Sequence, residues 1–191
     1  MAGARPESGA ARARQRQGAG APLDTPEEIA RRLAELMHPS TVIVGVGNEL
    51  RGDDGAGVVV ADRLAGRVPW LVLDAGMAPE NFLGKLLDGR PESVVLIDAA
   101  AVGAPPGTVL LLGREDLTEA SPGTHGPSLL PVLEWLDEAG VAPCAVLGIQ
   151  PQRGDFGRGL SQAVGAAVER IVQAFGQLCG AEHGPEHGKQ R

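Results

Sequence analysis

The chain has 191 residues, enough for one domain around a single hydrophobic core. Its formal net charge of −7, from 24 acidic and 17 basic side chains, argues against a general binder of nucleic acid or anionic membranes. The two cysteines form no CxxC pair, which argues against a disulfide scaffold. No apolar run is long enough to span a membrane. Aromatic residues make up only 3% of the chain, which argues against a stacking platform for single-stranded nucleic acid. We therefore expect a protein of the reducing cytoplasm.

The first 23 residues, rich in Ala, Gly, Arg, Pro and Gln, are predicted to be a disordered extension. No hydrophobic core follows the arginines, so an export signal is not expected. Contact of this basic arm with an acidic partner is a less favoured alternative. Next, Thr25-Pro26-Glu27-Glu28 has the pattern of a capping box with proline at the first helical position. We predict a helix there that covers a face or an edge of a sheet.

The stretch Val42–Gly57 reads VIVGVGNELRGDDGAG and predicts a strand, a glycine-rich loop and a helix. The β-branched run from Thr41 to Val44 is typical of a buried strand, and apolar residues at helical spacing follow Gly57. In an open α/β sheet, ligands bind beyond the carboxyl ends of the strands, where this loop would lie. We therefore predict a functional site at this loop.

This loop does not have the spacing of a dinucleotide-binding fingerprint, G-x-G-x-x-G, because four residues separate Gly47 from Gly52. Asp53 and Asp54 would also bring negative charge to the place of the pyrophosphate. Backbone donors beside two carboxylates favour a cation or the backbone of a polar substrate instead. An N-cap of the following helix is the alternative role for one of the two carboxylates, and both roles can coexist.

Two further strands are predicted at Trp70–Leu73 and Ser93–Ile97, with a short helix beginning at Pro79 between them. The second run is continuously apolar, as expected of a strand buried on both faces, and it ends in Asp98. A carboxylate there is costly to bury unless it is paired, hydrogen-bonded or bound to a metal. Because sites lie at such strand ends, we favour a functional role for Asp98 over the capping of a neighbouring loop.

An antiparallel or edge strand is predicted at Thr108–Leu112, and the loop 113–126 follows it. Loops of this length are often functional. This one contains His125, which taken alone would be interpreted as a surface histidine. A helix is expected after Ser128 as its N-cap, which would place Pro131 at the third helical position, where no N–H is needed.

The C-terminal part is predicted to contain the last strand at Ala145–Ile149 and a final helix from Ser161 to Leu178. Three residues of metal-ligand type follow at regular spacing: Cys179, His183 and His187. Glycines and a proline between them would break the helix needed to align them, so we interpret residues 179–191 as a flexible tail. The single domain is then expected to span residues 24–178.

Conventional protease motifs are absent from the sequence, which contains neither GxSxG nor HExxH. A thiol nucleophile at Cys144 is disfavoured, because this residue begins a strand that looks buried and has no histidine nearby in sequence.

Together these motifs resemble those of the hydrogenase maturation endopeptidases, which trim the C-terminal extension from the large subunit of nickel–iron hydrogenases. The resemblance covers about Thr41 to Phe175 and neither tail. The segments that carry it are GVGNELRGDDGAG, LDAGMAPEN at Leu73–Asn81, LIDAA at Leu96–Ala100, His125 in its loop, and GIQP at Gly148–Pro151. APEN and GIQP are most similar to the branch that processes formate-hydrogenlyase-type large subunits.

The resemblance implies a single-domain α/β fold, a three-layer sandwich with a twisted, mostly parallel sheet and helices on both faces. It also implies that Asp54, Asp98 and His125 are catalytic and contact a metal, since they match the metal-contacting residues of the family position by position. The implied metal is nickel already held by cysteine thiolates of the hydrogenase precursor, so that only loaded precursor is cut. Two carboxylates and an imidazole suit nickel, zinc or similar ions and leave coordination positions open.

Around these three residues, Asp53 is expected to orient the ligands or to act as a general base. Asn48 is a candidate clamp for the substrate backbone. Four glycines would permit close approach of the substrate chain: Gly45, Gly47, Gly52 and Gly55. Two alternatives stay open, a chaperone that checks the nickel without cutting and a peptidase of the same fold that acts on another substrate.

Overall fold

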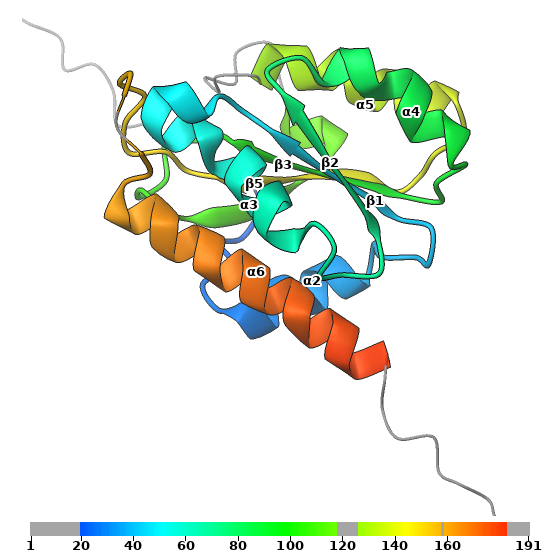
Figure 1. Cartoon of the computed structure of the whole chain (residues 1–191), viewed down its shortest axis with the longest axis horizontal. Coiled ribbons are helices and arrows are strands. Elements are labelled where there is room, and N and C mark those ends of the chain that lie inside the picture. The colour runs from blue at the N-terminus through cyan, green and yellow to red at the C-terminus, as the bar shows by residue number, and fades with distance from the viewer. Residues whose placement is uncertain (1–19, 118–125, 158, 183–191) are drawn as a thin grey trace, which may run out of the picture.

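A computed structural model describes residues 20–117, 126–157 and 159–182, and within these ranges five strands form one sheet (Figure 1). The strand order is β2-β1-β3-β5-β4. Four strands run parallel, and β4 pairs antiparallel with β5 at one edge, as predicted for an antiparallel or edge strand. The strands are β1 (Val42–Val46), β2 (Leu71–Gly76), β3 (Val94–Ala99), β4 (Val109–Leu112) and β5 (Cys144–Ile149).

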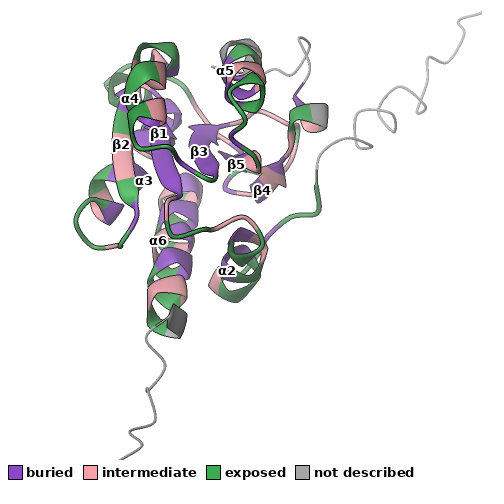
Figure 2. Ribbon diagram, turned by 90° about the vertical axis from the view of Figure 1, so that its right-hand side faces the viewer, coloured by how far each residue is buried: buried purple, intermediate pink, exposed green. Residues whose placement is uncertain are grey.

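Helices cover both faces of the sheet, which confirms the predicted three-layer α/β arrangement (Figures 1 and 2). One face packs against α2 (Pro26–Ala34), α3 (Ala56–Leu64) and α6 (Gln162–Glu182), and the other against α4 (Leu83–Asp88) and α5 (Gly126–Glu138). Side chains alternate between the two cores along each strand, since successive residues of a strand point to opposite faces. In β1, for example, Ile43 lies in the α3–α6 core, whereas Val42 and Val44 lie in the α4–α5 core.

The predicted capping box begins α2. The Thr25 hydroxyl accepts a hydrogen bond from the Glu28 amide, and the Glu28 carboxylate accepts one from the Thr25 amide, each at 3.2 Å. These bonds satisfy backbone amides at the start of the helix that have no partner within it. The helix buries Ile29 and Leu33 and packs against α6. The preceding Leu23 amide donates to the Val109 carbonyl at 2.9 Å, so the chain enters α2 along the outer edge of β4.

The expected start of α5 is wrong, because this helix begins at Gly126 and not after Ser128. Pro127 lies in the first turn, where proline is tolerated because its missing N–H is not needed. Pro131 is then inside the helix. Because proline has no N–H, the hydrogen bond from residue 131 to the carbonyl of Pro127 is missing. This missing bond lies in the first turns of the helix.

The expected end of α6 is also wrong, because the helix continues past Leu178 to Glu182 and includes Cys179 and Gly180. One glycine costs about 1 kcal/mol in a helix interior, which is too little to stop a long helix that is already packed against the sheet. His183 and His187 lie outside the described residues. None of the described helices combines the length and the apolar character needed to cross a bilayer.

Candidate functional site

The loop after β1 forms a 3₁₀ turn at Glu49–Gly55 that carries Asp53 and Asp54 at the carboxyl end of the sheet. The turn breaks at Gly52, whose φ of 59° and ψ of −122° suit glycine far better than any residue with a side chain. Both aspartates are buried. The N-cap of α3 is Gly55, so neither aspartate occupies the N-cap position and the alternative N-cap role is wrong.

The carboxylate of Asp53 accepts hydrogen bonds from three backbone amides of the loop between β5 and α6. Oδ2 receives them from Gln152 at 2.8 Å and Arg153 at 3.0 Å, and Oδ1 receives one from Ser161 at 2.5 Å. The Asp53 amide in turn donates to the Arg153 carbonyl at 3.2 Å. A carboxylate bonded in this way holds two loops together. The expected roles of Asp53, orienting the ligands or acting as a general base, both stay predictions.

Asp98 lies buried at the end of β3, next to the Asp54 turn. Gly45 of β1 pairs with Ile97, so the end of β1 lies beside Asp98, and the turn Glu49–Gly55 contacts β3. Gly57 approaches the Ile97 carbonyl so closely that an added Cβ would lie 2.0 Å from its oxygen. Asp54 and Asp98 therefore sit on packed elements at the carboxyl ends of adjacent parallel strands.

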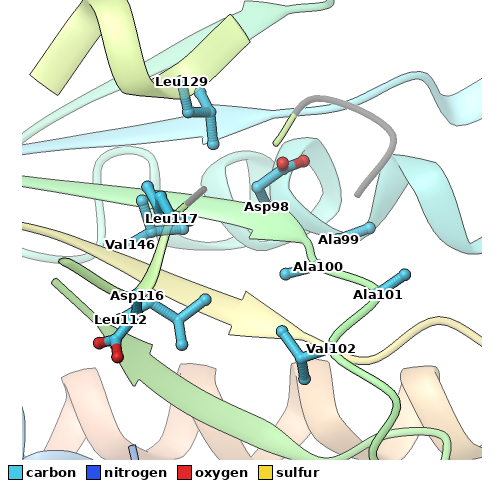
Figure 3. A pocket seen from close by; sticks show the side chains of 10 residues that line it. All are labelled: Asp98, Ala99, Ala100, Ala101, Val102, Leu112, Asp116, Leu117, Leu129 and Val146. Carbon is cyan, nitrogen blue, oxygen red and sulfur yellow. The ribbon is translucent and has the colours of Figure 1, made fainter. Parts of the chain in front are cut away.

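A small pocket opens beside Asp98, whose carboxylate lies on the side of the sheet that faces Leu129 of α5 (Figure 3). Leu117 and Leu129 line the pocket, and between them in sequence is the segment that contains His125. His125 lies outside the described residues, so its approach to the two carboxylates stays a prediction. Within the described ranges there is no group of three or more His, Cys, Asp or Glu side chains placed to hold a metal.

Sequence reasoning assigned no role to Gln150 of the GIQP segment, which ties together the loops at this end of the sheet. Its side-chain oxygen accepts hydrogen bonds from the amides of Val102 at 2.9 Å and Ala104 at 3.2 Å, in the loop that follows Asp98. Asp53 binds the same β5–α6 connection a few residues later. The one signal in the sequence is a glutamine directly after an apolar strand, where a polar side chain must find partners.

Contacts within the chain itself explain why Gly47 and Gly55 of the loop after β1 have no side chain. A Cβ on Gly47, which has a φ of +143°, would lie 1.9 Å from the Asp54 carbonyl oxygen, and one on Gly55 would lie 2.6 Å from the Cα of Glu49. Asn48 caps the turn, since its Oδ1 accepts from the Leu50 amide at 3.0 Å. Contact of a substrate with Gly47, Asn48, Gly52 or Gly55 stays a prediction.

Cys144 is poorly suited to nucleophilic chemistry. Burial raises the pKa of its thiol to about 11. A backbone hydrogen bond from Val94 opposes this rise, and the charge of Asp137 adds a smaller upward effect. The thiol also donates a hydrogen bond to the Val141 carbonyl at 3.1 Å. Since the thiolate is the reactive species, this environment agrees with the sequence-based expectation that Cys144 is not the nucleophile.

We expect Cys144 to resist alkylation in the folded protein. At pH 8 a thiol with a pKa of about 11 is ionised in only about one molecule in a thousand. Iodoacetamide labelling, followed by mass spectrometry of the peptide that contains Cys144, should therefore be far slower in buffer than in urea, where the pKa returns to its ordinary value. Equal labelling rates in buffer and in urea would contradict the raised pKa.

Comparison with known proteins gives concordant matches. A family model described as hydrogenase maturation protease matches residues 59–177. The hydrogenase 3 maturation protease of Escherichia coli K12 is 33% identical over 135 residues, which cover 69% of this chain and 86% of that protein. The crystal structure of a NiFe hydrogenase maturation protease HycI from Thermococcus kodakarensis superposes with a TM-score of 0.68 at 29% identity, covering 74% of this chain and 93% of that one. The solution structure of the endopeptidase HycI from Escherichia coli gives 0.64 at 31% identity, covering 75% and 91%.

Proposed function

Because this chain belongs to the hydrogenase maturation protease family and is therefore a peptide hydrolase, we propose that it removes the C-terminal extension of a nickel–iron hydrogenase large-subunit precursor after nickel insertion. In this proposal the protease recognises nickel that the precursor already holds. The metal is thus part of the substrate, and the expected place of action is the reducing cytoplasm.

One observation carries the proposal beyond family membership: two buried carboxylates, Asp54 and Asp98, lie on packed elements at the ends of adjacent parallel strands. Buried carboxylates cost free energy unless they are paired, hydrogen-bonded or bound to a cation, and strand ends of this kind are where α/β folds bind ligands. Asp54 and Asp98 would offer oxygen ligands and His125 a nitrogen ligand. The remaining coordination positions would stay with the thiolates of the precursor.

The residues around this site would fix its geometry. Asp53 joins the β1–α3 loop to the β5–α6 loop, and Gln150 joins the β5–α6 loop to the loop after β3, in each case through backbone amides. These bonds would fix the positions of the loops that carry Asp54 and Asp98. With the metal bound between protease and precursor, the scissile segment is either positioned for cleavage or polarised at its carbonyl.

Nickel-dependent processing tests the proposal. Purified protein is incubated with nickel-loaded precursor and, in parallel, with the same precursor prepared without nickel. We expect mass spectrometry to find the released C-terminal peptide only with the loaded form, because the metal supplies the contact that brings the precursor to Asp54 and Asp98.

The other results would point to the two alternatives. Tight binding of the loaded precursor without a released peptide would make the protein a nickel-checking chaperone. Equal cleavage of both precursor forms would make it a peptidase that does not depend on nickel. Either result contradicts the proposed function.

A further inference from the structure

Three large apolar side chains stand in solvent beside the Asp54 turn: Leu50 is 70% exposed, Met77 61% and Phe156 71%. Each belongs to a different loop at the carboxyl end of the sheet, the β1–α3, β2–α4 and β5–α6 loops respectively. Single exposed apolar residues are ordinary, but these three come together from segments far apart in the sequence. We call Leu50, Met77 and Phe156 the apolar platform.

Hydrogen bonds and a cation–π contact hold the loops of the platform beside one another. The Gly157 amide donates to the Leu50 carbonyl at 3.0 Å, and the guanidinium carbon of Arg51 lies 5.1 Å from the centre of the Phe156 ring. On the other side, the Asn48 side chain accepts from the Leu50 amide and donates to the Met77 sulfur, both at 3.0 Å. Figure 1 shows the turn before α3 beside the loop that leads into α6. The platform is therefore a connected surface.

We infer that the apolar platform binds an apolar segment of the hydrogenase precursor close to its nickel-bearing cysteines. This inference rests on the proposed function and adds an apolar segment to the features by which the protease selects its substrate. Leu50 lies in the same turn as Asp54, and Met77 and Phe156 contact this loop through Asn48 and Arg51. A substrate chain bound at Asp54 would therefore lie close to the platform. Arg51 gives the Phe156 side of the platform a positive charge, which complements an acidic group at that end of the bound segment.

The size of the platform favours a peptide segment over a second copy of the chain. Three side chains of this exposure offer roughly a few hundred Å² of apolar surface. A stable protein–protein interface needs about 800 Å² from each partner, whereas a short extended segment can cover the smaller area with two or three apolar side chains.

The test compares the double variant Leu50→Ser/Phe156→Ser with the control Leu71→Ser. Leu71 is 50% exposed but begins β2, at the opposite end of the sheet. With nickel-loaded precursor as substrate, we expect KM of the double variant to rise about tenfold or more, since burial of two apolar side chains is lost. Its kcat and thermal unfolding midpoint should stay at wild-type values, because exposed side chains contribute little to stability. The control should show a wild-type KM.

An unchanged KM in the double variant, or an equal rise in Leu71→Ser, would overturn the inference. A dimer in sedimentation experiments that the double substitution dissociates without changing KM would assign the surface to a second copy and also overturn it. If the wild-type protein binds the loaded precursor but does not cut it, the proposed cleavage is wrong. The inference about the platform is then tested separately, by measuring the affinity of each variant for the same precursor by titration calorimetry. Weaker binding by the double variant supports it, and equal binding overturns it.

Discussion

Replacing Asp54 or Asp98 with asparagine should lower the rate of precursor processing by more than about a hundredfold while the protein stays folded. Each substitution keeps the volume of a buried side chain but removes the negative charge that a cation requires. Changes to groups that only support metal ligands already cost ten- to a hundredfold in affinity or activity, so loss of a ligand itself should cost more. The measurement is the initial rate of peptide release from nickel-loaded precursor, with circular dichroism as the check of folding.

The matched control for these variants is Asp62→Asn, because Asp62 is an exposed acidic residue on α3. It should process precursor at the wild-type rate, which shows that the loss at the buried positions is not an effect of net charge. His125→Ala should behave like the Asp54 and Asp98 variants if its loop brings the imidazole to them. Wild-type activity in Asp54→Asn or Asp98→Asn would remove that residue from the site, and an unfolded variant would assign it a structural role.

The neighbouring carboxylate, Asp53, should behave differently from Asp54, since Asp53→Asn should destabilise the whole protein. Its two oxygens receive three backbone amides from the β5–α6 loop, and an amide side chain replaces one acceptor with a donor that faces those N–H groups. Buried amides left without an acceptor cost about 1–3 kcal/mol each, so we expect the free energy of unfolding to fall by about 3 kcal/mol or more. Urea unfolding monitored by circular dichroism measures this change.

Asp155→Asn on the same loop is the control, because Asp155 is exposed. It should unfold at the wild-type urea concentration. If Asp53→Asn keeps wild-type stability but loses processing, the role of Asp53 is chemical, and the general-base alternative gains support. If it loses neither, the three hydrogen bonds do not position this loop in solution.

Local patterns in the sequence predicted most of the strands and helices, and the family resemblance added the three-layer α/β fold. Continuous β-branched runs indicated buried parallel strands, a capping box indicated the start of α2, and an aspartate after a fully apolar run indicated a carboxylate at a strand end. Each of these signals involves residues within a few positions of one another, where backbone geometry and side-chain spacing dictate the outcome. Helix ends were predicted less well, since packing outweighs the small cost of one glycine in α6.

Which groups hold the Asp53 carboxylate was decided only by the tertiary structure. The partners of Asp53 lie 99, 100 and 108 residues further along the chain, and nothing in a local pattern reveals which of two adjacent carboxylates will meet them. The same holds for Gln150 and for the apolar platform, whose members come from loops that only the strand order β2-β1-β3-β5-β4 brings to one edge. The sequence by itself thus determines which side chains are available for chemistry. Which of them share a site depends on strand pairings between distant segments, and these pairings form only when the chain packs around its core.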